Sequence, residues 1–108
     1  MPRFLIIGQY APEGARGLMS AGGSARKTAV EKAVSGLGGR VETFDFAFGE
    51  DDIYTIVDMP DSDSVAALAL TVGGSGAVKV RTVVLMTPEQ LDRAAGLRPE
   101  YAPPGQTG

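Results

Sequence analysis

The same succession of segments occurs twice along the chain, and this repetition limits the fold more than any other feature of the sequence. Each half contains an apolar strand-like segment, a proline turn, a helix with a polar start, a glycine-rich stop and a second strand-like segment. The proline turns lie at residues 11–13 and 59–61, and the glycine stops lie at residues 38–39 and 74–76. This duplication predicts the element order βαββαβ.

Apolar periodicity gives approximate bounds for the elements. Strands are predicted over residues 3–10, 40–48, 53–59 and 77–86. Helices are predicted over residues 25–37, 65–72 and 88–95. Glycines weaken a continuous helix over residues 11–22, so only a short helical turn is expected there, around residues 15–20.

Polar residues at the helix starts serve as predicted caps. Ser24 is the expected N-cap of the first long helix, and Asp61 or Ser62 is that of the second. Thr87 and Gln90 have the spacing of a capping box at the start of the last helix.

The order of these elements is typical of an α+β protein. It predicts a ferredoxin-like βαββαβ sandwich with a short C-terminal helix. The length of 108 residues suits one domain, which we expect at residues 1–96. Residues 97–108 are rich in proline and glycine and are expected to form a tail that is mobile beyond Tyr101.

Both helices of this fold cover one face of the sheet and leave the other face open. The four predicted strands carry apolar residues on both sides, and the polar exceptions within them include Gln9, Asp45, Asp58, Lys79 and Arg81. A sheet with one solvated face alternates more cleanly, so the second face is expected to be buried against another copy in a homo-oligomer. The alternative is a monomer whose open face lines a ligand site.

The composition excludes several classes of function. The chain has no Cys and no His, which excludes disulfides, thiolate nucleophiles, Ser-His-Asp triads and ordinary zinc sites. The acidic turn at residues 50–52 lacks the ligand spacing of a calcium loop and is expected to be a solvated hairpin tip. We therefore expect no metal and no cofactor.

The net charge and the lengths of the apolar runs restrict the classes of partner that we expect. The net charge of −3 argues against a nucleic-acid partner. No apolar run approaches the roughly 20 residues of a membrane span. The apolar run near the N-terminus is also shorter than that of a secretory signal. A soluble, cytoplasmic protein that binds neither nucleic acid nor membrane is expected.

A series of short motifs resembles the GYD domain family over residues 3–95. The motifs are YAPEGARGL (10–18), GGSAR (22–26), VEK (30–32), LGG (37–39), FAFGE (46–50), DMPD (58–61) and LMTPE (85–89). The Gly-x-Tyr-Asp signature of the family reads Gly49-Glu50-Asp51-Asp52 here, with Asp51 in place of the tyrosine. The resemblance implies a ferredoxin-like fold similar to that of dimeric α/β-barrel proteins, which associate sheet to sheet. It implies no particular biochemical function.

The segment at residues 22–27 is the best candidate for a ligand site. Glycine N–H groups can approach an anion, and a helix N-terminus carries partial positive charge. Arg26 and Lys27 lie where the helix dipole favours acids, which is easier to accept if an anion binds there. The alternative is that Ser24 only caps the helix and the glycines form a tight turn. The candidate ligand-binding residues are Gly22, Gly23, Ser24, Arg26 and Lys27.

Weaker candidates for acid–base catalysis come from separate segments. Tyr10 ends the first strand and Arg16 follows it, and a phenol in an apolar pocket can have a shifted pKa. Packing with the hydroxyl at the rim is the ordinary alternative for this tyrosine. Lys79 and Arg81 share one side of their strand and could pair with Asp45. The candidate catalytic residues are Tyr10, Arg16, Asp45 and Asp58, with Tyr54 beside them.

Three functions from different classes remain open. The favoured hypothesis is an oligomeric binding or regulatory module for a small metabolite, with an anion as the preferred ligand. The alternative is a cofactor-independent isomerase, cyclase or lyase that uses Asp, Tyr or Arg for acid–base chemistry. The third is a purely structural interaction protein.

Overall fold

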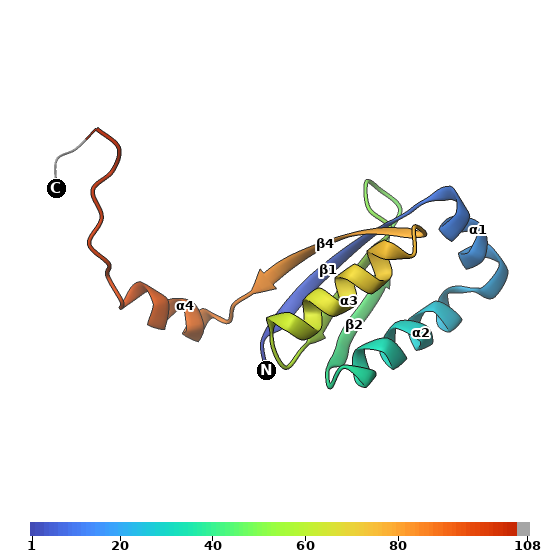
Figure 1. Cartoon of the computed structure of the whole chain (residues 1–108), viewed down its shortest axis with the longest axis horizontal. Helices are drawn as coiled ribbons and strands as arrows, with labels where there is room; N and C mark the ends of the chain where they lie inside the picture. Colours follow the sequence, from blue (N-terminus) through green and yellow to red (C-terminus); the bar gives the residue numbers. More distant parts are fainter. Residues whose placement is uncertain (106–108) are drawn as a thin grey trace.

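The computed structural model describes residues 1–105 and contains an antiparallel sheet with helices on one side (Figure 1). In chain order the elements are β1 (Arg3–Tyr10), α1 (Pro12–Ala21), α2 (Gly23–Gly36), β2 (Arg40–Phe46), β3 (Ile53–Asp58), α3 (Ser62–Gly74), β4 (Val78–Leu85) and α4 (Pro88–Ala95). The strand order is β2-β3-β1-β4, and every neighbouring pair is antiparallel. This topology confirms the predicted ferredoxin-like α+β fold.

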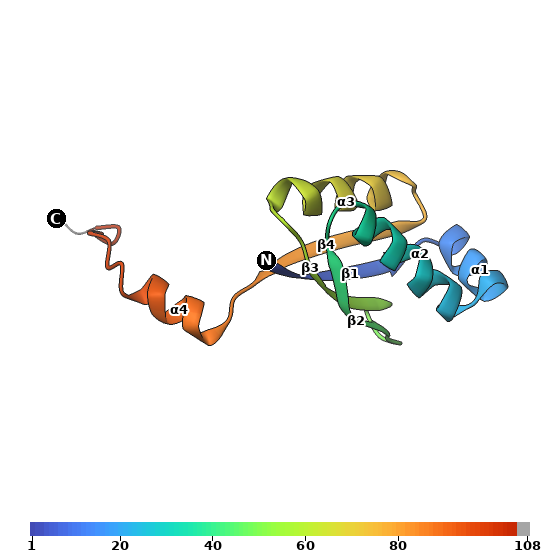
Figure 2. The same ribbon diagram turned by 90° about the horizontal axis from the view of Figure 1, so that it is seen from below.

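The hydrophobic core lies between the sheet and the helices α2 and α3, which cover the same face (Figure 2). Side chains alternate along a strand, so Phe4 and Ile6 of β1 point toward the helices while their neighbours point away. The buried core residues are Phe4, Ile6, Val34, Val57, Met59, Val65 and Leu68.

The helix α1 corrects the prediction of a short turn at residues 15–20. Ten residues are helical, with Pro12 in the first turn, where its missing N–H costs nothing. A side chain at Gly14 would collide with the carbonyl oxygen of Ala77, just before β4. The glycine therefore allows close packing of α1 against the chain entering β4, and this tertiary contact outweighs its low helix propensity.

The prediction that Ser24 caps the second helix is wrong. Helix α2 already begins at Gly23, and Gly22 joins it to α1 with a φ of 90°, a left-handed conformation that suits glycine. Ser24 thus lies inside the first turn, and its side chain makes no capping bond. Gly22 also ends α1, because its N–H donates to the carbonyl of Leu18 at 2.8 Å.

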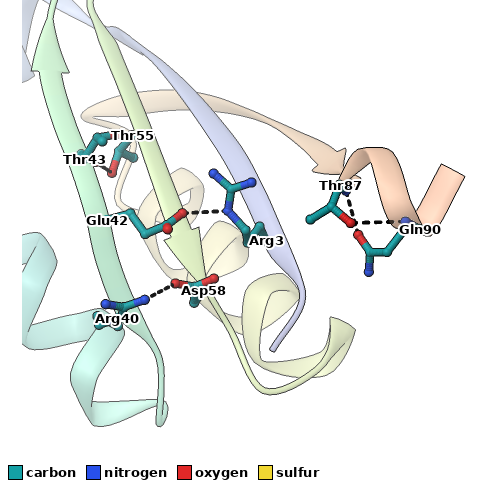
Figure 3. A network of polar contacts seen from close by, with 8 residues as sticks. All are labelled: Arg3, Arg40, Glu42, Thr43, Thr55, Asp58, Thr87 and Gln90. Carbon is teal, nitrogen blue, oxygen red and sulfur yellow. Dashed lines mark hydrogen bonds and ion pairs between the residues drawn. The ribbon is translucent and has the colours of Figure 1, made fainter.

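The other caps follow the sequence prediction. Asp61 caps α3 in a reciprocal arrangement with Ser64, so the first of the two predicted alternatives is correct. Thr87 and Gln90 form the predicted capping box of α4 (Figure 3). Strand β2 ends at Phe46, two residues earlier than expected, which leaves Phe48 fully exposed in the turn.

The C-terminal segment extends away from the sheet (Figures 1 and 2). The radius of gyration is 17.5 Å, against about 13 Å for a compact chain of this length. Helix α4 contains no buried residue, and Leu91 on it is 60% exposed. Residues 106–108 of the predicted tail lie outside the described residues.

The face of the sheet opposite the helices carries an apolar strip. Cross-strand partners share a face, and the register aligns Leu5 of β1 with both Ile56 and Val83. We call this set the open-face strip; it consists of Leu5, Ile7, Ile56, Val83 and Leu85.

Ion pairs border the open-face strip (Figure 3). Arg3 donates to the Glu42 carboxylate at 2.7 Å, and this hydrogen bond and charge raise the pKa of the Arg3 guanidinium. Arg40 donates to the buried Asp58 carboxylate at 2.8 Å. The strip therefore has the composition of an interface centre, apolar inside with paired charges at its edge.

Candidate functional site

Two polar side chains meet beside the N-terminal part of α2. Tyr10 is the last residue of β1, and Arg26 lies near the start of α2. Within residues 1–105, the Tyr10 Oη and the Arg26 Nε are buried atoms that have no hydrogen-bond partner. Buried polar groups are nearly always bonded in native proteins, so two unpaired polar atoms side by side call for a partner.

A cavity of about 320 Å³ lies between α1, α2 and the beginning of β4. We call it the α1–α2 cavity; its lining includes Tyr10, Glu13, Gly22, Ala25, Arg26, Ala29 and Val78. Tyr10 and Arg26 both contribute to it, while the rest of this set is mostly small or apolar. The cavity therefore brings together a phenol and a guanidinium that are 16 positions apart in the sequence.

A second cavity of about 120 Å³ lies between α2 and α3 over the sheet. We call it the α2–α3 cleft; its lining includes Ile6, Arg26, Ala29, Val30, Ala33, Phe44, Thr55, Ala69, Val72, Val78 and Val80. Small side chains on both helices, among them Ala33 and Ala69, leave this space unfilled. Arg26, Ala29 and Val78 line both cavities, so the two cavities share part of their walls.

The α1–α2 cavity holds a phenol beside one positive charge. Burial raises the pKa of the Tyr10 phenol, and the charge of Arg26 offsets part of that rise. Tyr10 therefore keeps its proton at neutral pH and can donate a hydrogen bond, as the guanidinium can. Glu13, which is exposed, also lines the cavity and disfavours a ligand with several negative charges.

Asp52 fixes the position of Tyr10. Its carboxylate accepts a 2.8 Å hydrogen bond from the backbone N–H of Tyr10, and its own N–H donates to the carbonyl of Gly8 at 2.8 Å. The prediction of a solvated tip at residues 50–52 does not include this role. The signal was the family signature, in which Asp52 matches the aspartate.

Asp51, which stands in the tyrosine position of the signature, is bound within the fold. Its carboxylate accepts a hydrogen bond of 2.9 Å from the Arg81 guanidinium on β4, and its side chain is 12% exposed. The substitution thus gives this chain an ion pair between the β2–β3 turn and the edge of the sheet. Of the three acidic residues, Glu50 alone is exposed, so the predicted solvated tip is wrong for Asp51 and Asp52.

The predicted anion-site residues separate in the structure. Arg26 and Gly22 line the α1–α2 cavity. Gly23 packs against Phe46, whose ring lies 2.9 Å from the position of an added Cβ. Ser24 and Lys27 are exposed and line neither cavity.

The predicted acid–base residues do not come together. Asp58 pairs with Arg3 at the end of β1 remote from Tyr10, and its carboxylate is held by Arg40. Arg16 is exposed on α1. Only Tyr10 reaches the α1–α2 cavity.

The remaining charged candidates lie on the edge strands. Asp45 of β2 pairs with Tyr54, and both are exposed. Lys79 and Arg81 lie on β4, at the other edge of the sheet, and Arg81 binds Asp51 instead of Asp45.

Two kinds of feature are absent from residues 1–105. Over residues 1–105 there is no group of three acidic side chains arranged to hold a metal ion. In the same part of the chain, no helix has the length and apolar character needed to cross a membrane.

The comparisons with known proteins agree with the fold. No curated protein matches the chain. The family model of the GYD domain matches residues 4–95, a span that includes both cavities and the β2–β3 turn. By this match, the chain belongs to the GYD domain family.

Proposed function

We propose that this GYD-domain protein is a binding or regulatory module for a small anionic metabolite. The ligand binds in the α1–α2 cavity, where its negative charge accepts hydrogen bonds from Arg26 and Tyr10. One observation carries the proposal: the Arg26 Nε and the Tyr10 Oη are buried against each other beside a cavity, and neither has a hydrogen-bond partner of good geometry. A bound anion satisfies both donors, and a charge-assisted bond is stronger than a neutral one.

Binding is favoured over the alternative of an isomerase, cyclase or lyase. Acid–base chemistry requires a proton acceptor close to the donor. The candidate carboxylate Asp58 is held by Arg40 at the other end of β1, and Glu13, the carboxylate that lines the cavity, is exposed. The cavity is therefore better suited to binding an anion than to transferring a proton.

The test is stabilisation of the folded chain by simple anions. Sodium acetate and sodium phosphate are titrated at constant ionic strength, and the melting temperature is recorded. A ligand that binds only the folded state raises the melting temperature with concentration. Arg26→Met keeps the apolar stem and removes the donors, so this variant should lose the anion-dependent rise.

Lys27→Met is the matched control. Lys27 is the next residue on α2, carries the same charge and lines neither cavity. This variant should keep the wild-type response to both anions. An equal response of wild type and Arg26→Met would show that the anions act through general electrostatics, and the proposed site would be wrong.

We also propose that the protein forms a homo-oligomer through the open-face strip. Five apolar residues line one face of the sheet, and Val83 among them is 41% exposed in the single chain. A second copy on this face would bury the strip inside its border of ion pairs. It would also offer a packing surface to α4, since an eight-residue helix is marginally stable alone. The cytoplasmic location expected from the sequence stays a prediction.

A further inference from the structure

The α2–α3 cleft indicates the size and the polarity of the ligand, which the anion site alone does not. The cleft runs along α2 from Arg26 past Ala29 to Ala33, about 10 Å at the rise of an α-helix. Besides Arg26, the one other residue in its lining with a polar side chain is Thr55, whose hydroxyl already donates to the carbonyl of Thr43 at 2.7 Å. The guanidinium is therefore the single free polar group of an otherwise apolar space.

We propose that the natural ligand is an amphipathic monocarboxylate. This inference rests on the proposed function, because the carboxylate takes the place of the anion at Arg26 and Tyr10. An apolar chain or ring then extends from it into the α2–α3 cleft. Because Arg26, Ala29 and Val78 line both cavities, a molecule held at Arg26 in one cavity lies next to the other.

The size of the cleft sets the size of the apolar part. The cleft has a volume of about 120 Å³, and an engineered apolar cavity of about 150 Å³ binds benzene. A chain of about five or six carbons fits the same volume. Ala29, Ala33 and Ala69 create this space, because larger residues at these positions would close it.

The charge of the ligand follows from the acidic residues around Tyr10. Glu13 lines the α1–α2 cavity, and the Asp52 carboxylate lies on the backbone of Tyr10. Both groups repel a second negative charge on the ligand. Arg26 is the one basic residue in the lining of either cavity, so a single carboxylate matches the site better than a phosphate ester.

The test compares carboxylates of increasing chain length by calorimetric titration of the full chain. Acetate, butyrate and hexanoate are measured at one ionic strength, with hexan-1-ol as the uncharged probe. Each methylene that enters the cleft should tighten binding by about fourfold. Hexanoate should therefore bind far more tightly than acetate, and hexan-1-ol should bind more weakly than hexanoate.

Substitutions on α3 separate the cleft from the anion site. Ala69→Leu fills the cleft and should remove the effect of chain length while acetate binding persists. Ala67→Leu places the same side chain at an exposed position of α3 that lines neither cavity, and it should behave as wild type. If Ala69→Leu does not fold by circular dichroism, Ala33→Val on α2 fills the cleft from the other side.

The outcomes distinguish the two proposals. Two results would overturn the inference and leave the anion site standing. One is equal affinity for acetate and hexanoate, and the other is a chain-length effect that persists in both Ala69→Leu and Ala33→Val. Hexan-1-ol binding as tightly as hexanoate, with Arg26→Met altering neither, would overturn the anion site, and the inference would fall with it. Chain-length dependence that needs both Arg26 and an open cleft would establish the amphipathic ligand.

Discussion

The carboxylate of Asp52 accepts a 2.8 Å hydrogen bond from the backbone N–H of Tyr10, across 42 positions of sequence. The same residue joins the β2–β3 turn to β1 through its own N–H, which donates to Gly8. The aspartate of the family signature thus holds the end of β1, where the phenol enters the α1–α2 cavity. We infer that this signature residue positions the candidate site.

Asp52→Ala should therefore lower the free energy of unfolding by about 2 kcal/mol, because the substitution removes a charged acceptor from a half-buried N–H. Urea denaturation measures the change. Glu50→Ala, in the same turn and exposed, should leave the midpoint unaltered. A loss of stability in Glu50→Ala equal to that in Asp52→Ala would assign the effect to the turn as a whole.

Two glycines of α1 should respond to alanine in opposite directions. A Cβ at Gly14 would collide with the carbonyl of Ala77, and Gly14→Ala should cost about 1–3 kcal/mol of stability. A Cβ at Gly17 meets no atom within 4 Å, so Gly17→Ala should gain about 0.5–1 kcal/mol from higher helix propensity. Urea unfolding of the pair tests whether α1 packs as described, and equal effects would contradict that packing.

These glycines also illustrate which parts of the fold can be predicted from the sequence and which cannot. Strand alternation and helix caps are local patterns, so the two faces of β4 and the capping box at Thr87 were predictable. The helix α1 was not, because its glycines look unfavourable until the contact of Gly14 with Ala77 is known.

The candidate site was predictable in its parts but not as a unit. Arg26 and Tyr10 were each candidate residues, yet they belonged to two different hypotheses, one for an anion and one for acid–base chemistry. Their meeting depends on how α2 packs beside the end of β1, which no local pattern records. The cleft beside them depends on the spacing of two helices, so the alanines that line it read as ordinary core residues.

The raised pKa of Tyr10 predicts a loss of stability at high pH. The folded chain holds this proton more tightly than the unfolded chain, in which the phenol has its ordinary pKa of about 10. The stabilisation of the folded chain that comes from this pKa difference is therefore complete below about pH 10. It is lost as the pH rises through the folded-state pKa of Tyr10. Tyr10→Phe should show a shallower fall in unfolding free energy than wild type between about pH 9 and 11.

The control for that titration is Tyr101→Phe, which alters an exposed phenol on the C-terminal segment. Its pH profile in urea denaturation should coincide with that of wild type. Identical profiles for Tyr10→Phe and wild type would mean that the phenol is not buried in solution, which would also weaken its role as a donor to the ligand.

The proposed association through the open-face strip predicts a mass of at least twice 11.2 kDa in light scattering at micromolar concentration. Val83→Lys places a charge in the strip, beside Leu5, and should shift the mass toward 11.2 kDa. Val83 is 41% exposed in the single chain, so the lysine can reach solvent and the fold should persist, which circular dichroism can verify.

Leu70→Lys is the matched control for the same experiment. Leu70 is 76% exposed on α3, on the helix side of the sheet, and its replacement should leave the mass unchanged. A wild-type mass of 11.2 kDa would refute association through the strip, because the apolar face would then remain in contact with water. Dissociation by Leu70→Lys instead of Val83→Lys would place the interface on the helices, where it would cover the outer side of α3.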